Sequence, residues 1–332
     1  MRIAVIGAGA VGATLAALLD RDGHDLEITA RGEHLAAIRS TGIRLGGAWG
    51  EHTARVAAND VLSSVPDLVI VATKAPDAAD ALNASSAVLA GVPVIIVQNG
   101  LAALSSGGCL GTKSAVVGAL ALFAASYVNP GQITVTAPGA VYLGVQEHRS
   151  EVDDRGLTLS QRVLGAVLPA RATENFRGAQ WTKLVVNQIN ALPAITGLSA
   201  QAVIADLGLR RIMVGSMQEA VCAGLAAGIR FETLQGLSHP LLRLFASAPF
   251  TLAQLLPLAM ARRMGTIPNP GSTLQSIRRG QLTEIDYLNG AVASEAARLR
   301  MDAAINERLV RLVHEVERSG RFFSPAELTE FF

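Results

Sequence analysis

Cysteine and charge are both scarce in this chain of 332 residues. Its two cysteines, Cys109 and Cys222, cannot build a disulfide framework and are typical of a reducing cytosol. Charged residues make up 17% of the sequence, and the formal net charge of +1 gives no electrostatic reason to expect nucleic acid or an acidic membrane. The six histidines are dispersed without the spacing of a metal site. We therefore expect a cytoplasmic protein with no nucleic acid, membrane or metal partner.

Apolar residues, in contrast, are plentiful. They make up half of the chain, and a length of 332 residues exceeds what one hydrophobic core usually serves, so two domains are expected. The first third alternates helical segments with the buried strand patterns "RIAVIG", "LEITA", "DLVIVAT" and "VPVIIVQN". This rhythm predicts an α/β fold with a parallel, doubly wound sheet over residues 1–170. Residues 171–332 are predicted to form an all-helical domain, with helices at 181–196, 209–228, 240–263, 284–298 and 306–318.

Two local patterns refine this outline. The segment "TVTAPGAVYLGV" predicts an antiparallel hairpin that turns at Pro138 and Gly139. The tetrapeptide "SPAE" at residues 324–327 predicts a capping box with proline at the first position of a helix.

A glycine-rich turn follows the first predicted strand. Residues 7–12 read "GAGAVG", and a strand before it with a helix after it is the context of a dinucleotide-binding fingerprint. Gly7 permits the tight turn, Gly9 lets the backbone approach a pyrophosphate, and Gly12 allows close packing of helix on sheet. The alternative is a merely tight turn. We expect the cofactor contacts to come from Gly7, Ala8, Gly9, Ala10, Val11 and Gly12.

The end of the second strand indicates which dinucleotide binds. An NAD site usually carries an acidic residue about 20 residues after the glycines, whereas "LEITARGEH" continues through Thr29 and Ala30 to Arg31. A guanidinium suits a 2′-phosphate, so we predict NADP(H) bound by Arg31; a solvent-facing arginine is the alternative. Lys74 and Asn99 follow two further strands, whose carboxyl ends face the ligand in open α/β sheets. A surface lysine and a turn-forming Asn-Gly pair are the alternatives.

A polar stripe interrupts the apolar segment "QWTKLVVNQIN", residues 180–190. At about 100° per residue, Lys183, Asn187 and Asn190 fall on one helix face. Burial lowers the pKa of an ammonium, which would suit Lys183 as general acid for a carbonyl that accepts a hydride. The two asparagines could hold the other oxygens of the substrate. A lysine that extends to water along an amphipathic helix is the alternative.

A second polar anomaly is Glu284 in "LTEIDYLNG", which Ser272 precedes in a loop rich in proline and glycine. A carboxylate that faces Lys183 would compensate its buried charge. The alternative for Glu284 is capping of a helix start, where an acidic residue favours the helix dipole.

With "GAGAVG", "ATK", "QNG", "WTKLVVN" and "TEIDYLNG" in this order, the chain resembles the ketopantoate reductase (2-dehydropantoate 2-reductase) family from Met1 to about His314. The resemblance implies an N-terminal Rossmann-type doubly wound domain, a C-terminal helical domain and NADPH in the cleft between them. It implies reduction of 2-dehydropantoate to pantoate, for pantothenate and coenzyme A synthesis. It also implies residue roles: Lys183 as general acid, Asn187 and Ser272 as substrate ligands, Asn99 near nicotinamide and substrate, Glu284 at the cofactor, Arg31 on the 2′-phosphate and Ala124 as a backbone contact.

One position departs from the family pattern. Members with the biosynthetic activity often carry an asparagine two turns after the lysine, where this chain has Ala191, with Asn190 one residue earlier. Residues 231–264 form a longer segment than compact members have. The alternatives to ketopantoate reductase are a related NADP-dependent hydroxy-acid or opine-type dehydrogenase and a non-catalytic NADP(H) sensor. Apolar helices serve cores and dimer interfaces equally, so a homodimer stays open.

Overall fold

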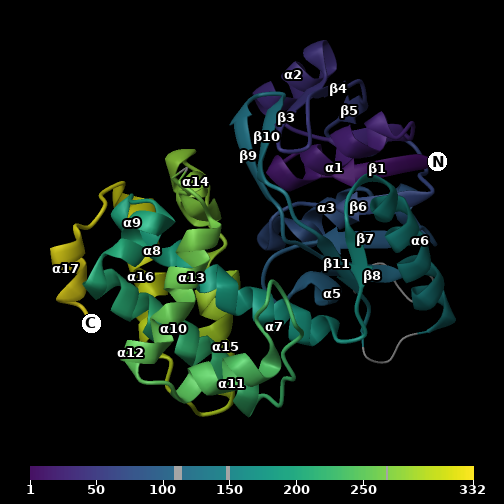
Figure 1. Cartoon of the computed structure of the whole chain (residues 1–332). Coiled ribbons are helices and arrows are strands. Elements are labelled where there is room, and N and C mark those ends of the chain that lie inside the picture. The colour runs from purple at the N-terminus through teal and green to yellow at the C-terminus, as the bar shows by residue number, and fades with distance from the viewer. Residues whose placement is uncertain (108–113, 147–149, 267) are drawn as a thin grey trace. The chain divides into compact units, whose positions relative to one another are not determined.

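The computed structural model describes residues 1–107, 114–146, 150–266 and 268–332 (Figure 1), so Cys109 and His148 lie outside the described residues. The chain forms two compact units, Met1–Phe176 and Arg177–Phe332. The first unit is α/β and the second is helical, which confirms the predicted fold class. Within the described ranges, no helix has the length and apolar character needed to cross a membrane.

The first unit is built on an eight-stranded sheet in the order β12-β11-β8-β7-β6-β1-β2-β5. The strands from β5 to β8 are parallel, β11 runs antiparallel to β8, and β12 is parallel to β11. The strands span β1 (Arg2–Ile6), β2 (Asp25–Thr29), β5 (Ala57–Asn59), β6 (Leu68–Val71), β7 (Val94–Val97), β8 (Val116–Ala121), β11 (Val141–Gly144) and β12 (Ala170–Ala172).

Alternate residues of the central strands pack on opposite faces of this sheet. Ile3 and Val5 of β1 belong to a core that includes α1 (Ala10–Arg21) and α6 (Glu151–Val167). Ala4 and Ile6 belong to a second core with α3 (Ala78–Ala84). Both faces are covered, as expected for a parallel sheet whose strands are continuous apolar runs.

A four-stranded sheet in the order β4-β3-β10-β9 completes the first unit; its strands span β3 (Ile43–Gly47), β4 (His52–Ala54), β9 (Ala124–Asn129) and β10 (Gln132–Ala137). The predicted hairpin at Pro138 and Gly139 is wrong, because β10 pairs with β9 and β3 whereas β11 pairs with β8 in the large sheet. Alternating apolar residues indicate an extended segment but do not specify its partner strand. The hairpin turn lies earlier, at Gly131, where φ is +76°.

The second unit packs helices around α10 (Leu207–Ala226), which contacts α9, α11, α15 and α16. The capping box predicted at Ser324 is confirmed: its side chain accepts from the Glu327 N–H, and Glu327 bonds back to the Ser324 N–H. The other elements are α7 (Phe176–Asn187), η3 (Gln188–Asn190), α8 (Ala191–Thr196), α9 (Ala200–Ala205), α11 (His239–Ser247), α12 (Phe250–Ala253), α13 (Leu255–Arg263), α14 (Gly271–Arg278), η4 (Ile285–Tyr287), α15 (Asn289–Arg298), α16 (Ala304–Ser319) and α17 (Pro325–Thr329).

Two long helices predicted in this unit are interrupted. The segment 181–196 is divided into α7, the 3-10 turn η3 and α8, and the segment 240–263 is divided into α11, α12 and α13. Pro193, Pro249 and Pro257 explain the breaks, since proline lacks an N–H and its ring clashes with the carbonyl four residues earlier. The predicted helix at 284–298 instead begins with the 3-10 turn η4.

Candidate functional site

The glycine turn between β1 and α1 meets three different steric demands. Gly7 has φ +101°, and a Cβ there would lie 2.9 Å from the backbone nitrogen of Thr73. A Cβ on Gly12 would lie 2.0 Å from the carbonyl oxygen of Gly7, so α1 packs on the turn at a distance that only glycine permits. A Cβ on Gly9 would meet nothing within 4 Å among the described residues. The turn is therefore closed on the protein side and open at Gly9, which is the N-cap of α1.

The carboxyl ends of neighbouring strands surround this turn. The Gly7 N–H donates to the Thr29 hydroxyl at the end of β2, at 3.0 Å. The Gln98 carboxamide donates to the Thr73 carbonyl at 3.5 Å, which joins the segments that follow β7 and β6. Lys74 and Asn99 are the next residues along these two segments. Both residues that the sequence singled out therefore follow strands that end at one edge of the sheet.

Two buried oxygens in the same two segments lack hydrogen-bond partners within the described residues. They are Oγ1 of Thr73 and Oε1 of Gln98. An unsatisfied buried polar group costs about 1–3 kcal/mol, so such a group indicates a partner that the chain itself does not supply. Neither residue was predicted from the sequence, where the charged or amide residue that comes next in each segment was the candidate.

Glu27, the buried acidic residue of β2, is hydrogen-bonded in the interior of the first unit. Glu27 is buried and its carboxylate accepts from the Ser63 N–H at 2.7 Å, the Ser64 hydroxyl at 2.7 Å and the Asn59 carboxamide at 3.0 Å. Burial opposes ionisation, but these hydrogen bonds hold the pKa of Glu27 below its usual value. Arg31, by contrast, is exposed at the N-cap of α2 (Gly32–Thr41). The first charged side chain beyond the end of β2 is therefore a cation, although Glu33 follows it two residues later.

A histidine in the first turn of α2 links the glycine turn to the β9–β10 hairpin. Nε2 of His34 lies 2.7 Å from the Ala8 carbonyl oxygen, and the Gly131 N–H donates to Nδ1 at 2.9 Å. Because Nδ1 accepts, the ring is neutral with its hydrogen on Nε2, and burial lowers the pKa of His34. Ala124, a predicted cofactor contact, begins β9 and accepts from the Thr136 hydroxyl at 3.2 Å.

Lys183 and Glu284 act on each other within the second unit. Lys183 lies on α7 and is only 8% exposed, and burial lowers its pKa to about 8 although the charge of Glu284 opposes that shift. Glu284 is half-buried at the N-cap of η4. An amine with this pKa is largely protonated at neutral pH and releases its proton more readily than an ordinary lysine does.

The predicted stripe of Lys183, Asn187 and Asn190 crosses a change of helix type. Asn187 is the last residue of α7 and Asn190 lies in the 3-10 turn η3, where a residue three positions later returns to the same face. Nδ2 of Asn187 is buried without a partner within the described part of the chain. Asn187 thus offers a hydrogen-bond donor that a bound ligand could satisfy.

Asn190 lies against the start of α14, the helix that follows the predicted binding loop. A Cβ on Gly271, whose φ is +71°, would lie 2.6 Å from Oδ1 of Asn190. Ser272 is the next residue and is exposed. The fold therefore brings Asn190 close to the segment that carries Ser272.

A buried polar network joins the 3-10 turn η3 to neighbouring helices, and it was not predicted from the sequence. Gln188, Ser216, Asn289 and Asn306 are all 0% exposed. Oε1 of Gln188 accepts from the Ser216 hydroxyl at 2.8 Å and from Nδ2 of Asn289 at 2.7 Å. Nδ2 of Asn289 also donates to Asn306 at 2.9 Å, and Asn306 donates to Glu219 at 2.6 Å. These bonds fix η3 against α10, α15 and α16.

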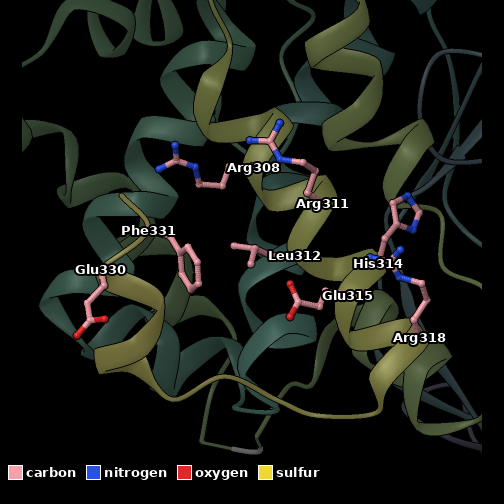
Figure 2. A pocket seen from close by; sticks show the side chains of 8 residues that line it. All are labelled: Arg308, Arg311, Leu312, His314, Glu315, Arg318, Glu330 and Phe331. Atoms are coloured by element: carbon pink, nitrogen blue, oxygen red, sulfur yellow. The ribbon is translucent and has the colours of Figure 1, made fainter.

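An open pocket lies over α16 and the C-terminal residues (Figure 2). Its arginines alternate with acidic residues, which is typical of a solvated helix face. Among the described residues, none of those predicted for the cofactor or the substrate lines it. The lining residues are Arg308, Arg311, Leu312, His314, Glu315, Arg318, Glu330 and Phe331.

Lysine is rare in this chain, and its rarity is a further sequence signal for a functional amine. Only three of the 28 basic residues are lysines: Lys74, Lys113 and Lys183. Arginine stays protonated at any physiological pH, whereas lysine changes its pKa readily when buried. A lysine buried in an apolar helix of an arginine-rich chain therefore indicates a titratable amine.

Comparisons with known sequences cover both units. The family model "Ketopantoate reductase PanE/ApbA" matches residues 3–148, and "Ketopantoate reductase PanE/ApbA C terminal" matches residues 175–317. A 2-dehydropantoate 2-reductase of Mesorhizobium japonicum is 30% identical over 321 residues, which cover 88% of this chain and 90% of the relative. The corresponding protein of Pyrococcus horikoshii is 29% identical and covers 96% of this chain and 99% of its own.

Solved structures show the same architecture. A PanE/ApbA family ketopantoate reductase from Ralstonia eutropha JMP134 has a TM-score of 0.80 at 28% identity, covering 96% of this chain and 99% of the other. D-mandelate dehydrogenase, solved with NADH and anilino(oxo)acetate, also has a TM-score of 0.80 and the same coverage, at 20% identity. At that identity the second likeness shows the fold alone.

Proposed function

The chain belongs to the ketopantoate reductase family, and from that premise we propose that it reduces 2-dehydropantoate to pantoate with NADPH. The observation that carries the proposal is the buried Lys183, whose pKa is about 8 beside Glu284. When bound, the nicotinamide cofactor supplies the hydride for the keto carbon of the 2-oxo acid. The carbonyl oxygen then becomes basic and takes a proton from the Lys183 ammonium, which leaves a 2-hydroxy acid. Glu284 favours the protonated state from which Lys183 acts.

The first unit offers the groups that would hold the dinucleotide. The open side of the turn at Gly9 and the start of α1 suit a pyrophosphate, and Arg31 suits a 2′-phosphate. The unsatisfied oxygens of Thr73 and Gln98 suit hydrogen-bond donors of the cofactor. Since Glu27 is occupied in the interior, we assign NADP(H) rather than NAD(H). The remaining proposed cofactor contacts are Gly7, Ala8, Ala10, Val11, Gly12, Lys74, Asn99 and Ala124 in this unit and Glu284 in the second unit.

We assign the binding of the substrate oxygens to amide and hydroxyl side chains. The unsatisfied Nδ2 of Asn187 donates to one of them, and the exposed Ser272 hydroxyl binds the carboxylate. Ala191, at the position where the family often has asparagine, is 0% exposed, so Asn190 beside Gly271 takes over that contact. Asn99 completes the proposed set.

We place this reaction in the cytoplasm, with a small 2-oxo acid as the partner. The use of only two cysteines supports a reducing compartment. Burial, followed by the nearby charge of Glu219, raises the pKa of the Cys222 thiol, as expected for an unreactive packing residue. Size-exclusion chromatography distinguishes a monomer from a homodimer.

The test is NADPH consumption by the purified protein with 2-dehydropantoate and a panel of other 2-oxo acids. The proposal predicts the highest kcat/KM for 2-dehydropantoate. Faster turnover of another 2-oxo acid would indicate a hydroxy-acid dehydrogenase, and NADPH binding without any turnover would indicate a sensor. Arg31→Ala separates the cofactors, because it weakens NADPH far more than NADH if Arg31 binds the 2′-phosphate. Equal losses for the two cofactors contradict that assignment.

A further inference from the structure

The segment that carries Glu284 is tied to α16 on both sides of that residue. The Thr283 N–H donates to Oε1 of Glu317 at 2.7 Å. On the other side, Oδ1 of Asp286 lies 3.0 Å from Nε2 of His314. Nδ1 of the same imidazole lies 2.6 Å from Oε2 of Glu317, which closes the chain of contacts. We call these contacts of Glu317 and His314 the α16 clamp.

The clamp works with a charged imidazole. Both ring nitrogens of His314 face carboxylate oxygens, which only accept hydrogen bonds, so both nitrogens carry hydrogen. Burial lowers the pKa of His314, but Asp286 and Glu317 outweigh it and the net pKa is raised. Figure 2 shows the other charged groups that line the same pocket as His314, which are Arg308, Arg311, Glu315 and Arg318 of α16 and Glu330.

Glu317 is the stronger half of the clamp. Its side chain is 11% exposed, compared with 38% for His314 and 60% for Asp286. Exposed ion pairs contribute little, whereas a largely buried carboxylate that accepts a backbone N–H fixes the chain at that point. Glu317 therefore anchors Thr283, and His314 holds Glu317 and Asp286 in place.

We propose that Glu317 and His314 are positioning residues for Glu284, whose carboxylate they hold where it acts on Lys183. The catalytic meaning of this inference rests on the proposed function, but the electrostatic relationship does not. If the clamp is removed, the segment 283–286 relaxes and the carboxylate of Glu284 moves away from the ammonium. The pKa of Lys183 then falls below its value of about 8.

Lysine-selective isotope labelling makes this pKa directly measurable. Because the chain has only three lysines, the NMR spectrum of the labelled full-length protein is simple, and Lys183→Arg identifies the Lys183 signal. A pH titration without substrate or cofactor then gives the Lys183 pKa in each variant. Glu284→Gln is the benchmark, since it removes the charge itself.

We expect Glu317→Ala to lower the Lys183 pKa in the same direction as Glu284→Gln, by about half a pH unit or more. The double variant should titrate like Glu284→Gln alone, because the clamp acts through that carboxylate. His314→Ala should lower the pKa less, and His314→Arg, which keeps a positive donor, should restore it. His314 is half-exposed, so these two variants keep the test available if Glu317→Ala does not fold.

Glu327→Ala is the matched control. Glu327 also accepts a backbone N–H, that of Ser324 at 2.8 Å, and pairs with Arg321, and neither contact involves residues 283–286. An unchanged Lys183 pKa in Glu317→Ala and His314→Ala would overturn the inference if Glu284→Gln shifts it. An equal shift in Glu327→Ala, or a full further shift in the double variant, would also overturn it. Failure of the proposed function appears separately, as absence of 2-oxo acid turnover by the wild-type protein.

Discussion

Gly271 lies so close to Asn190 that a Cβ at its position would come within 2.6 Å of the Asn190 side-chain oxygen. Its φ of +71° is a second reason for glycine, since other residues rarely adopt that backbone conformation. A carboxamide can rotate away from a methyl group, so the steric demand concerns the orientation of Asn190 more than the stability of the fold.

Gly271→Ala should therefore raise KM for the 2-oxo acid about tenfold, as expected for the loss of one well-made hydrogen bond to a charged group. Gly280→Ala is the control, because Gly280 also has a positive φ of +62° but nothing within 4 Å of its Cβ among the described residues. Both variants should lose about 1–2 kcal/mol of folding free energy, the cost of placing a Cβ on a left-handed backbone. Equal KM values in steady-state kinetics would show that Asn190 does not bind substrate.

The rate of reduction should depend on the protonation of Lys183. Since Lys183 has a pKa of about 8 and acts as a proton donor, kcat should be constant at lower pH and fall as pH rises through that value. Glu284→Gln should move this fall to lower pH, because the carboxylate is what raises the Lys183 pKa against burial. A kcat profile that is flat to pH values well above 8 would contradict the assignment.

Lys183 should also lower the stability of the fold. Its pKa is about 8 in the folded protein and ordinarily 10.5, which corresponds to about 3 kcal/mol against the folded state at neutral pH. The unfolded chain binds more protons between these two values, so stability should rise with pH over that range. Lys183→Met should raise Tm at neutral pH, and thermal unfolding at about pH 10 should show a smaller gain.

His34 should support NADPH affinity, and its contribution to the stability of the fold should depend on pH. His34→Phe removes both bonds that join the glycine turn to the hairpin, so NADPH affinity measured by fluorescence titration should fall about fivefold or more. The pKa of His34 is depressed below 6.5, so its contribution to stability is present above that pH and lost as pH falls through the lower folded value. His34→Gln, which retains a donor and an acceptor, is the conservative control. Wild-type affinity in His34→Phe would exclude this role.

Local patterns predicted those parts of the molecule that local sterics determine. The turn at Gly7 and Gly12 follows from the tight turn and close packing that only glycine allows, and the capping box at Ser324 is specified by four residues. The strand β11 was recognised as a strand but given the wrong partner, because alternation specifies extended backbone and not the neighbouring strand.

Long-range contacts could not be predicted from these patterns. Asn187 and Gln188 are adjacent polar residues, yet one has an unsatisfied donor and the other lies within a buried network with Asn289. The sequence alone does not distinguish the unsatisfied residue from the bonded one, because the difference depends on which distant helices pack against each side chain. Pro193 is the local signal for the change from α-helix to 3-10 turn before Asn190.

The most direct test of the account compares NADPH binding with turnover in Lys183→Met. If Lys183 donates the proton, the variant should bind NADPH with wild-type affinity while kcat for 2-dehydropantoate falls about 100-fold or more. A folded Lys183→Met protein that reduces 2-dehydropantoate at the wild-type rate would contradict the central claim.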